Sequence, residues 1–495
     1  MGAHRVPQTF RSGGLAAAVL LVCVALTACG GGGGGTGSVT GATTGSSTGG
    51  TAGAATGDTA GGGAATGTTA GGAAAGGTTP SGGTTGAPPV DPPVISSFGA
   101  SPHAIAAGRS TTLNWNVANA DSLKLMPGNI DVTGSSSRVI TPVAGATYTL
   151  VAANAGGTRQ ATAGVSIYDW TELAAALDAF LPPGGALVGY SFILFDRQGV
   201  LYTRAGGNQT MDSVDAIASA TKLASSAAIL TLVDAGKLDL DRPVGDYFHL
   251  GTILWPLDKA AITTRMLLNH TSGLAGFQDS SQPTCINLET TTTLQKCAQN
   301  IADSALLNSP GSTYDYGGVD YQVAGYLATV ISGKNWHQFF TDTVGTPLQL
   351  ASFSYGDPAK VTNPRIAGGA DSNAADYAKL LGMVQGGGAL SNVRVLSQAR
   401  ADLLLDNQIA GLPVAYSPLN TSQYPGYSFG FFSSAASLYP GSPGPEFSDP
   451  GLLGTTPWID MGLGYGAVIL TNSNTQTGLN AWNAARPKVI QQLTR

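Results

Sequence analysis

One stretch of the chain is apolar on almost every side of a helix. From Leu223 to Val233 the sequence is rich in alanine and leucine and has few polar residues. A helix of this composition lies buried inside a domain rather than on its surface. Gly236 follows and provides a natural C-terminal stop. The pattern predicts a central buried helix within residues 217–236.

Hydrophobic runs on both sides of this helix predict a sheet. Residues 186–195 and 199–203 have the pattern of a strand pair, and further strands are expected between residues 427 and 472. Helices are expected at 170–180 and near the end of the chain. Strands at both ends with helices between them indicate an α+β domain over residues 169–495, with a sheet that joins both ends.

Residues 94–168 alternate with a period of two. Leu113, Trp115 and Val117 alternate with polar residues, and four more short runs follow, separated by Gly, Pro and Asn. This predicts a small antiparallel β-sandwich with Trp115 in its core. The region resembles the immunoglobulin-like modules of secreted bacterial proteins. We expect it to act as a spacer, with contact to peptidoglycan or another glycan as the alternative.

The N-terminal 29 residues have the pattern of an export signal. Arg5 and Arg11 precede an apolar run that is too short to span a bilayer permanently. The four residues Leu-Thr-Ala-Cys resemble the bacterial lipoprotein processing box. This implies lipid attachment at Cys29 and anchoring to the cell envelope, in the periplasm or at the outer membrane. A plain cleaved signal is the alternative.

A tether is expected next, over residues 30–93. This stretch consists almost entirely of Gly, Thr, Ala and Ser and ends in a Pro-rich segment. Such a composition cannot bury a core, and sixty residues of it reach roughly 40–45 Å as a flexible coil. The whole chain has 495 residues, a net charge of −6 and 11% charged residues, so neither a nucleic-acid partner nor a basic membrane-surface patch is indicated.

Ser219 and Lys222 stand at the start of the central helix, three residues apart, so they share one face. A helix start favours developing negative charge. Burial at the mouth of the helix would lower the pKa of Lys222 and make it a neutral base for Ser219. A capping serine with a snorkelling lysine is the alternative, and these residues alone leave both interpretations open.

Three motifs stand out in this region: Ser219-Ala-Thr-Lys222, residues 232–244, and Leu-Leu-Asn-His-Thr-Ser-Gly-Leu at 267–274. They resemble the serine β-lactamase and penicillin-binding-protein superfamily, and in particular its class C-like branch, which includes family VIII esterases and D,D-peptidase homologues. The resemblance implies that Ser219 is acylated, that Lys222 assists, and that Tyr316 acts as base and then acid. Tyr314 is the alternative to Tyr316 for this role, but we expect Tyr314 to be a packing aromatic instead. The resemblance makes His270 part of a structural turn.

The chain departs from the family pattern at two places in the expected substrate cleft. Gly318 stands where the family often has Asn. Asp449 stands where the third motif usually begins with Lys or His, followed by Gly451. The N–H groups of Ser219 and Leu452 would form an oxyanion hole. An acid at position 449 would repel a substrate carboxylate, so we expect a neutral ester or amide substrate.

Cys285 and Cys297 lie just after the His-Thr-Ser-Gly block. In an exported protein they are expected to form a disulfide, worth roughly 2–3 kcal/mol through loop entropy. No zinc site is expected because no ligand quartet is nearby, and no cofactor is implied. Ser428 lies in a Gly-x-Ser-x-Gly sequence, which is the nucleophile motif of α/β-hydrolases. In that fold the catalytic histidine follows the serine in the chain, and no histidine follows His337, so an α/β-hydrolase is not expected.

Two functions from different classes follow. The first is a lipid-anchored serine hydrolase that forms an acyl-enzyme at Ser219. The second is an envelope binding protein that keeps the penicillin-binding fold with weakened chemistry, because of the departures at Gly318 and Asp449.

Overall fold

A computed structural model of the chain describes residues 90–495. The predicted export signal, the predicted lipidation site Cys29 and the tether up to residue 89 lie outside the described residues. Within 90–495, no helix is long and apolar enough to cross a membrane.

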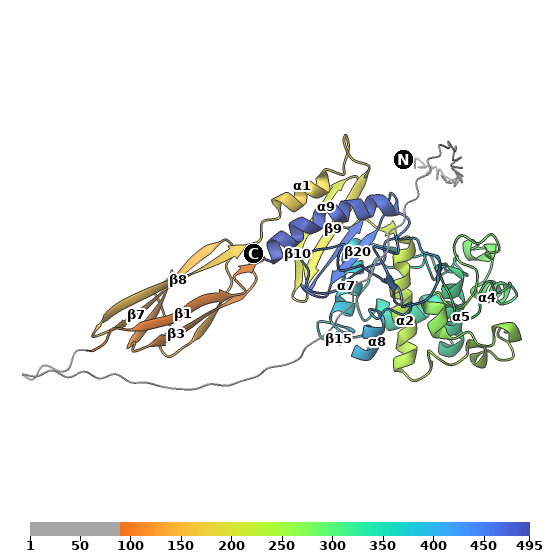
Figure 1. Cartoon of the computed structure of the whole chain (residues 1–495), viewed down its shortest axis with the longest axis horizontal. Helices are drawn as coiled ribbons and strands as arrows, with labels where there is room; N and C mark the ends of the chain where they lie inside the picture. The colour runs from red at the N-terminus through yellow and green to blue at the C-terminus, as the bar shows by residue number, and fades with distance from the viewer. Residues whose placement is uncertain (1–89) are drawn as a thin grey trace, which may run out of the picture. The chain divides into compact units, whose positions relative to one another are not determined.

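A seven-stranded sheet forms the centre of the C-terminal domain, and its neighbouring strands are all antiparallel (Figure 1). In spatial order the strands are β10 (Gly199–Gly207), β9 (Gly189–Asp196), β21 (Tyr465–Leu470), β20 (Thr456–Asp460), β19 (Glu446–Ser448), β18 (Phe432–Ser433) and β17 (Gly426–Tyr427). The pairing of β9 with β21 joins the two ends of the domain. The predicted α+β fold with a shared sheet is therefore confirmed.

Both faces of this sheet are covered, which explains why β9 is apolar at consecutive positions. Alternate residues of a strand point to opposite faces. Phe192 belongs to the core shared with α1 (Thr171–Asp178) and α9 (Thr475–Leu493), whereas Ile193 belongs to the core shared with α2 (Thr221–Asp234) and α7 (Ala374–Gln385). Figure 1 shows α9 lying along the sheet.

Helix α2 is the predicted central helix, and all but two of its residues are buried. It ends at Ala235 and Gly236, where Gly236 adopts a left-handed φ of 65°. The helices that pack against it are α5 (Val319–Ser332), α6 (Trp336–Phe340) and α8 (Gln398–Leu403). The two residues of α2 that are not buried, Thr231 and Asp234, lie toward its C-terminal end, whereas its first turn is enclosed by the domain.

Short elements complete the helical region. The remaining helices are α3 (Thr264–Leu268) and α4 (Leu294–Ala302). The two-stranded sheets are β11 (Asp215–Ala216) with β13 (Asp371–Ser372), β12 (Tyr314–Asp315) with β16 (Val414–Tyr416), and β14 (Ala389–Leu390) with β15 (Val393–Arg394). The parallel pair of β12 and β16 holds the segment that leads to Tyr316.

Residues 427–432, where strands are expected to begin, form a hairpin. Tyr427 pairs with Phe432, and the chain turns between them. Gly430 has a φ of 108°, and a side chain there would lie 2.8 Å from the backbone of Leu223. The turn between the two strands is held by the close approach of Gly430 to α2. This contact joins distant segments, so the local sequence pattern does not predict it.

Residues 94–167 form two sheets of their own. One contains β1 (Val94–Ser101), β3 (Thr111–Ala118) and β6 (Ser137–Ile140). The other contains β2 (Ala104–Ile105), β8 (Gly157–Ile167), β7 (Ala146–Asn154), β4 (Ser122–Met126) and β5 (Ile130–Asp131). Trp115 is buried among Leu113, Leu125 and Leu150, and its indole N–H donates to Ser135 O at 2.7 Å. The immunoglobulin-like assignment and the spacer role stay predictions.

Candidate active site

Ser219 lies in a single 3₁₀ turn, Ala218–Ala220, which runs directly into α2. Ala218 just before it has a φ of 45°, a left-handed conformation that is uncommon for alanine. The Nζ atom of Lys222 lies 3.4 Å from Ser219 Oγ and donates to the carbonyl oxygen of Ala367 at 3.0 Å. The serine and the amine therefore meet at the first turn, as their spacing predicts.

Tyr316 reaches the same point from a distant part of the chain. Its backbone N–H donates to Tyr416 O at 3.1 Å, next to the pairing of β12 with β16. Lys222 Nζ lies 4.4 Å from the centre of the Tyr316 ring. The Tyr316 hydroxyl is buried and faces Ser219 without a well-aligned hydrogen bond. The three residues thus come together around one buried amine.

Burial sets the protonation of these groups. It lowers the pKa of Lys222 to about 8, against the opposing influence of Asp449. It raises the pKa of Tyr316 well above its ordinary value, and Asp449 raises it further. Lys222 is therefore the group of this pair that can accept a proton near neutral pH, while Tyr316 keeps its own. Of the two residues expected to act as the base, these pKa shifts favour Lys222 over Tyr316.

A cleft opens beside Ser219, Lys222 and Tyr316 and is largely apolar. Its apolar lining includes Phe277, Ile286, Tyr416, Pro418, Pro450 and Leu452. Its polar lining includes Gln282, Asn287, Gln322, Arg365 and Thr475. Arg365 lies 3.7 Å from Glu289, which offsets its charge. Tyr314 does not line the cleft and packs against Tyr427 instead, with ring centres 5.4 Å apart.

The predicted oxyanion segment lies at this cleft. Ser219 and Leu452 both line it, and the N–H of Leu452 donates no backbone hydrogen bond within residues 90–495. A side chain on Gly451 would lie 2.3 Å from Ile217 O. Glycine at 451 thus lets the loop after β19 press against the segment that carries Ser219.

Asp449 does not occupy the place that the sequence suggested. Its side chain is fully buried, does not line the cleft, and finds no hydrogen-bond partner within the part of the chain that the structure describes. Burial raises the pKa of Asp449 well above its ordinary value, against the opposing influence of Lys222, so the charged carboxylate is disfavoured there. Its neighbours Pro450 and Leu452 line the cleft instead, so the Asp449 side chain does not meet a substrate there directly.

Gly318 does line the cleft. It caps the start of α5 with an ordinary φ of −106°. A side chain there would first meet Ile286 Cδ1 at 3.7 Å and Ala367 Cβ at 3.9 Å, which are ordinary contacts. With glycine at this position, the cleft has no side-chain amide where the family often has Asn, although a side chain would fit there.

His270 is buried away from the cleft. Its Nδ1 lies 3.2 Å from Asp320 Oδ2, and its Nε2 lies 3.3 Å from the Tyr427 hydroxyl. Burial lowers the pKa of His270 well below its ordinary value, and Lys222 lowers it further. A neutral, fully partnered histidine fits the structural role that the resemblance implies.

Ser428 makes a structural contact as well. Its hydroxyl is buried and donates to Leu404 O at 2.5 Å and to Phe431 O at 3.2 Å. A hydroxyl held by two carbonyl oxygens in a turn is not exposed for attack, which agrees with setting aside the α/β-hydrolase interpretation.

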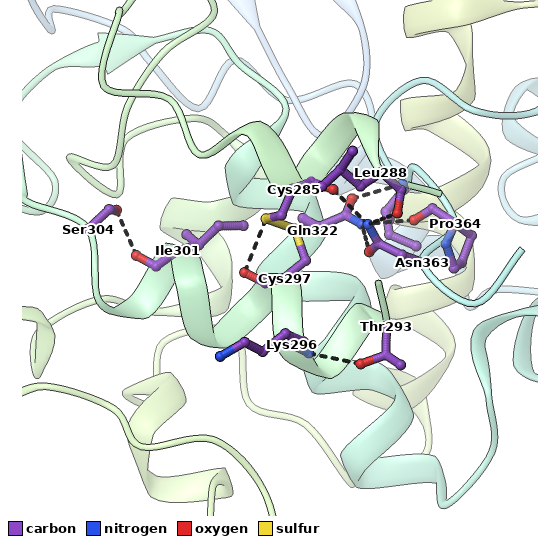
Figure 2. The surroundings of a disulfide bond; sticks show 11 residues. Cys285, Leu288, Thr293, Lys296, Cys297, Ile301, Ser304, Gln322, Asn363 and Pro364 are labelled. Atoms are coloured by element: carbon purple, nitrogen blue, oxygen red, sulfur yellow. Dashed lines mark hydrogen bonds between the residues drawn. A yellow bond between two sulfur atoms is a disulfide. The ribbon is translucent and has the colours of Figure 1, made fainter. Parts of the chain in front are cut away.

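Cys285 and Cys297 form the predicted disulfide (Figure 2). Ile286 and Asn287 follow Cys285 directly and line the cleft wall. Within residues 90–495, no group of three or more His, Cys, Asp and Glu side chains is placed to hold a metal ion.

Sequence reasoning missed several residues of the site. The carbonyl oxygen of Ala367 holds Lys222, and a backbone acceptor has no side-chain signature; only the Gly368-Gly369 pair after it marks an unusual segment. Tyr416 reaches the cleft through a two-residue parallel pairing, which no periodicity reveals. Arg365 is a single charged residue within a loop segment that carries no motif.

These features define a class of protein. It is an α+β domain in which a serine and a lysine at the mouth of a buried helix meet a tyrosine from a separate segment. A family model described as Beta-lactamase matches residues 174–488, more than half of the chain. The chain therefore belongs to the beta-lactamase family of serine hydrolases, which confirms the resemblance seen in its motifs.

Known relatives agree with this assignment. Penicillin-binding protein 4 of Amycolatopsis lactamdurans is 28% identical over 310 residues, covering 56% of this chain and 77% of the relative. The D-alanyl-D-alanine-carboxypeptidase/endopeptidase AmpH of Escherichia coli K12 is 26% identical over 182 residues, 35% of this chain and 46% of the relative. The crystal structure of a penicillin-binding protein homologue from Caulobacter crescentus matches with a TM-score of 0.53, at 19% identity, over 64% of this chain and 97% of that one. The last likeness shows the fold alone.

Proposed function

We propose that this protein hydrolyses ester or amide substrates through an acyl-enzyme at Ser219, with neutral esters preferred. The observation that carries the proposal is the meeting of Ser219, Lys222 and Tyr316 at one cleft, with Lys222 Nζ 3.4 Å from Ser219 Oγ and 4.4 Å from the Tyr316 ring centre. Such a nucleophile and base within reach of each other are the signature of covalent catalysis.

The first chemical step is acylation. Neutral Lys222 takes the proton of Ser219 while Oγ bonds to the substrate carbonyl carbon. The oxygen that gains charge is held by the N–H groups of Ser219 and Leu452. When the tetrahedral intermediate collapses, Tyr316 gives its proton to the leaving group and takes the proton held by Lys222. A water molecule then attacks the acyl carbon and gives up its proton to the same groups. Ser219 regains a proton as its bond to the acyl group breaks, and the carboxylic acid is released.

The apolar cleft supports the preference for a neutral ester. Phe277, Ile286 and Leu452 suit an apolar acyl group, and Glu289 offsets the charge of Arg365. Repulsion by Asp449 no longer supports this preference, because that carboxyl is buried. Glycine at position 318 also favours esters, because no side-chain amide is present there to bind an amide substrate.

The lack of a side-chain amide at Gly318 also favours a second candidate function, a binding protein with weakened chemistry. The relatives named above are called a penicillin-binding protein and a D-alanyl-D-alanine carboxypeptidase. A protein of this fold that binds such ligands without turnover would keep the cleft and lose reactivity at Ser219.

A fluorophosphonate probe tests the hydrolase proposal. We expect covalent labelling of the wild type and none of Ser219→Ala, with folding checked by circular dichroism. Turnover of short acyl p-nitrophenyl esters should exceed turnover of penicillins and of D-alanyl-D-alanine peptides. Absence of labelling in the folded wild type would favour the binding protein, and faster penicillin turnover would contradict the ester preference.

We further propose that the protein is exported and held at the cell envelope by a lipid on Cys29, with residues 94–168 as a spacer. Incorporation of radiolabelled palmitate that is lost in Cys29→Ala tests the anchor. Binding of the wild type to isolated peptidoglycan would instead support the glycan-contact alternative for the spacer.

A further inference from the structure

The wall of the cleft is part of a loop that the disulfide closes. Cys285 and Cys297 are both buried. The side chain of Asn363 donates through Nδ2 to Cys285 O at 2.8 Å and to Leu288 O at 3.3 Å (Figure 2). The loop that presents Ile286 and Asn287 to the cleft is therefore held at its start by a covalent bond and by one buried amide.

A second buried amide, Gln322 of α5, holds Asn363 in turn. Its Nε2 donates to Asn363 Oδ1 at 2.7 Å and to Pro364 O at 2.9 Å, and its Oε1 accepts from the N–H of Ile366 at 3.2 Å. Gln322 is 1% exposed, so these are buried contacts. Every polar atom of its side chain is used to hold the segment 363–366.

The same segment ends at the residue that holds the catalytic amine. Ile366 O accepts from the hydroxyl of Ser225 in α2 at 2.6 Å, and Ala367 O accepts from Lys222 Nζ at 3.0 Å. The segment is thus bound to α2 on one side and to Gln322 on the other. A continuous set of contacts joins the disulfide loop to Lys222 through Asn363 and Gln322.

We propose that Gln322 is a positioning residue, which fixes the carbonyl of Ala367 against Lys222 and couples this contact to the disulfide-closed cleft wall. The proposal rests on the hydrolase function proposed above. Its physical basis is that a buried amide which loses its partners leaves them unsatisfied, so the segment shifts or admits water. Displacement of a catalytic group by about 1 Å lowers rates by up to about 100-fold.

The test compares Gln322→Met with a matched control, Gln385→Met. Both positions are 1% exposed, but the amide of Gln385 has no hydrogen-bond partner within residues 90–495 and lies outside the cleft. We expect Gln322→Met to lower the second-order rate of fluorophosphonate labelling by about 10- to 100-fold and Gln385→Met to leave it unchanged.

The pH profile separates positioning from general destabilisation. The groups that act on Lys222 are Asp449, Arg365, Asp320 and the rings of Tyr316 and Tyr321, and Gln322→Met removes none of them. A shift of the segment that carries Arg365 would weaken its lowering of the Lys222 pKa. Water admitted beside the amine would reduce the effect of burial. We therefore expect the midpoint of the labelling profile to move upward from about 8 in Gln322→Met only.

A double-mutant cycle tests the coupling to the disulfide. Cys285→Ala/Cys297→Ala should slow labelling and raise the KM for esters, because Ile286 and Asn287 are released. In the Gln322→Met background the same change should have little further effect on the labelling rate, since the connection is already broken. If the rate losses caused by Gln322→Met and by the loss of the disulfide multiplied in the combined variant, the coupling would be contradicted.

Gln322→Glu provides a second variant, which keeps the acceptor for Ile366 and removes both donations. A folded Gln322 variant that labels at the wild-type rate with an unmoved midpoint would overturn the proposal. Loss of folding in both variants would also overturn it, because the residue would then support the domain rather than the site. Failure of the wild type and Gln385→Met to label would refute the hydrolase function itself.

Discussion

The amine of Lys222 lies 4.4 Å from the centre of the Tyr316 ring, and both side chains are buried. The two residues are 94 positions apart in the sequence, yet they share one apolar environment beside Ser219. Burial moves their pKa values in opposite directions, down for the lysine and up for the tyrosine. One becomes a base near neutral pH and the other stays an acid.

Reactivity at Ser219 should rise with pH. Because neutral Lys222 is the base and burial lowers its pKa to about 8, kcat/KM for an ester should increase about tenfold per pH unit below 8 and level off above it. Rates of fluorophosphonate labelling from pH 6 to 10 measure this. A profile that is flat across pH 8 would exclude Lys222 as the base.

Removal of the buried amine should stabilise the fold while abolishing activity. A lysine whose pKa is lower in the folded state than in the unfolded state binds fewer protons when the protein is folded. The destabilisation that Lys222 causes is therefore fully present below pH 8 and is lost as the pH rises toward the ordinary pKa of lysine. We expect Lys222→Met to raise the free energy of unfolding at pH 7 by about 1–3 kcal/mol.

Urea denaturation at pH 7 and pH 10 measures this difference. The advantage of Lys222→Met over the wild type should shrink between the two pH values. An advantage that grows with pH would mean that burial does not lower the pKa of Lys222.

A methyl group on Gly451 should disrupt the oxyanion segment. It would lie 2.3 Å from Ile217 O, so the loop must move away from Ser219. We expect Gly451→Ala to lose about 1–3 kcal/mol of stability and at least about 100-fold in kcat. Gly164→Ala, where an added methyl group meets nothing within 4 Å, is the matched control. Wild-type kcat in Gly451→Ala would show that this loop is not part of the site.

An amide placed at position 318 should fit the cleft. The nearest atoms to a new side chain are 3.7 Å away, and Asn is favoured at a helix start. We expect Gly318→Asn to change stability by no more than about 0.5 kcal/mol. Turnover of amides or acylation by penicillins should increase relative to ester turnover, and comparison of the two rates measures it. An unchanged ratio would argue that the missing Asn does not set substrate preference.

The sequence was enough to predict the parts of the fold that depend on local pattern. The apolar run of α2 and the strand pair β9 and β10 were predicted from periodicity, and the sheet that joins both ends followed from their order. The hairpin at residues 427–432 was not, because its turn depends on Gly430 meeting the backbone of Leu223, a contact between distant segments.

The candidate site divides in the same way. The proximity of Ser219 and Lys222 follows from helical spacing, and Tyr316 followed from the family resemblance. The direction of the Asp449 side chain could not be predicted, since burial at the end of β19 depends on how the sheet packs. The contacts of Ala367 and Gln322 depend on backbone atoms brought together only by the tertiary fold.

The pairing of β9 with β21 has a consequence for the point at which the proposed active site is complete. A nascent chain that has emerged only as far as residue 440 already carries Ser219, Lys222 and Tyr316, but it lacks β21 beside β9 and the N–H of Leu452. Under the hydrolase function proposed above, competence therefore requires that the last tenth of the polypeptide has folded against β9. Truncated products of the ribosome would carry the nucleophile without a finished catalyst.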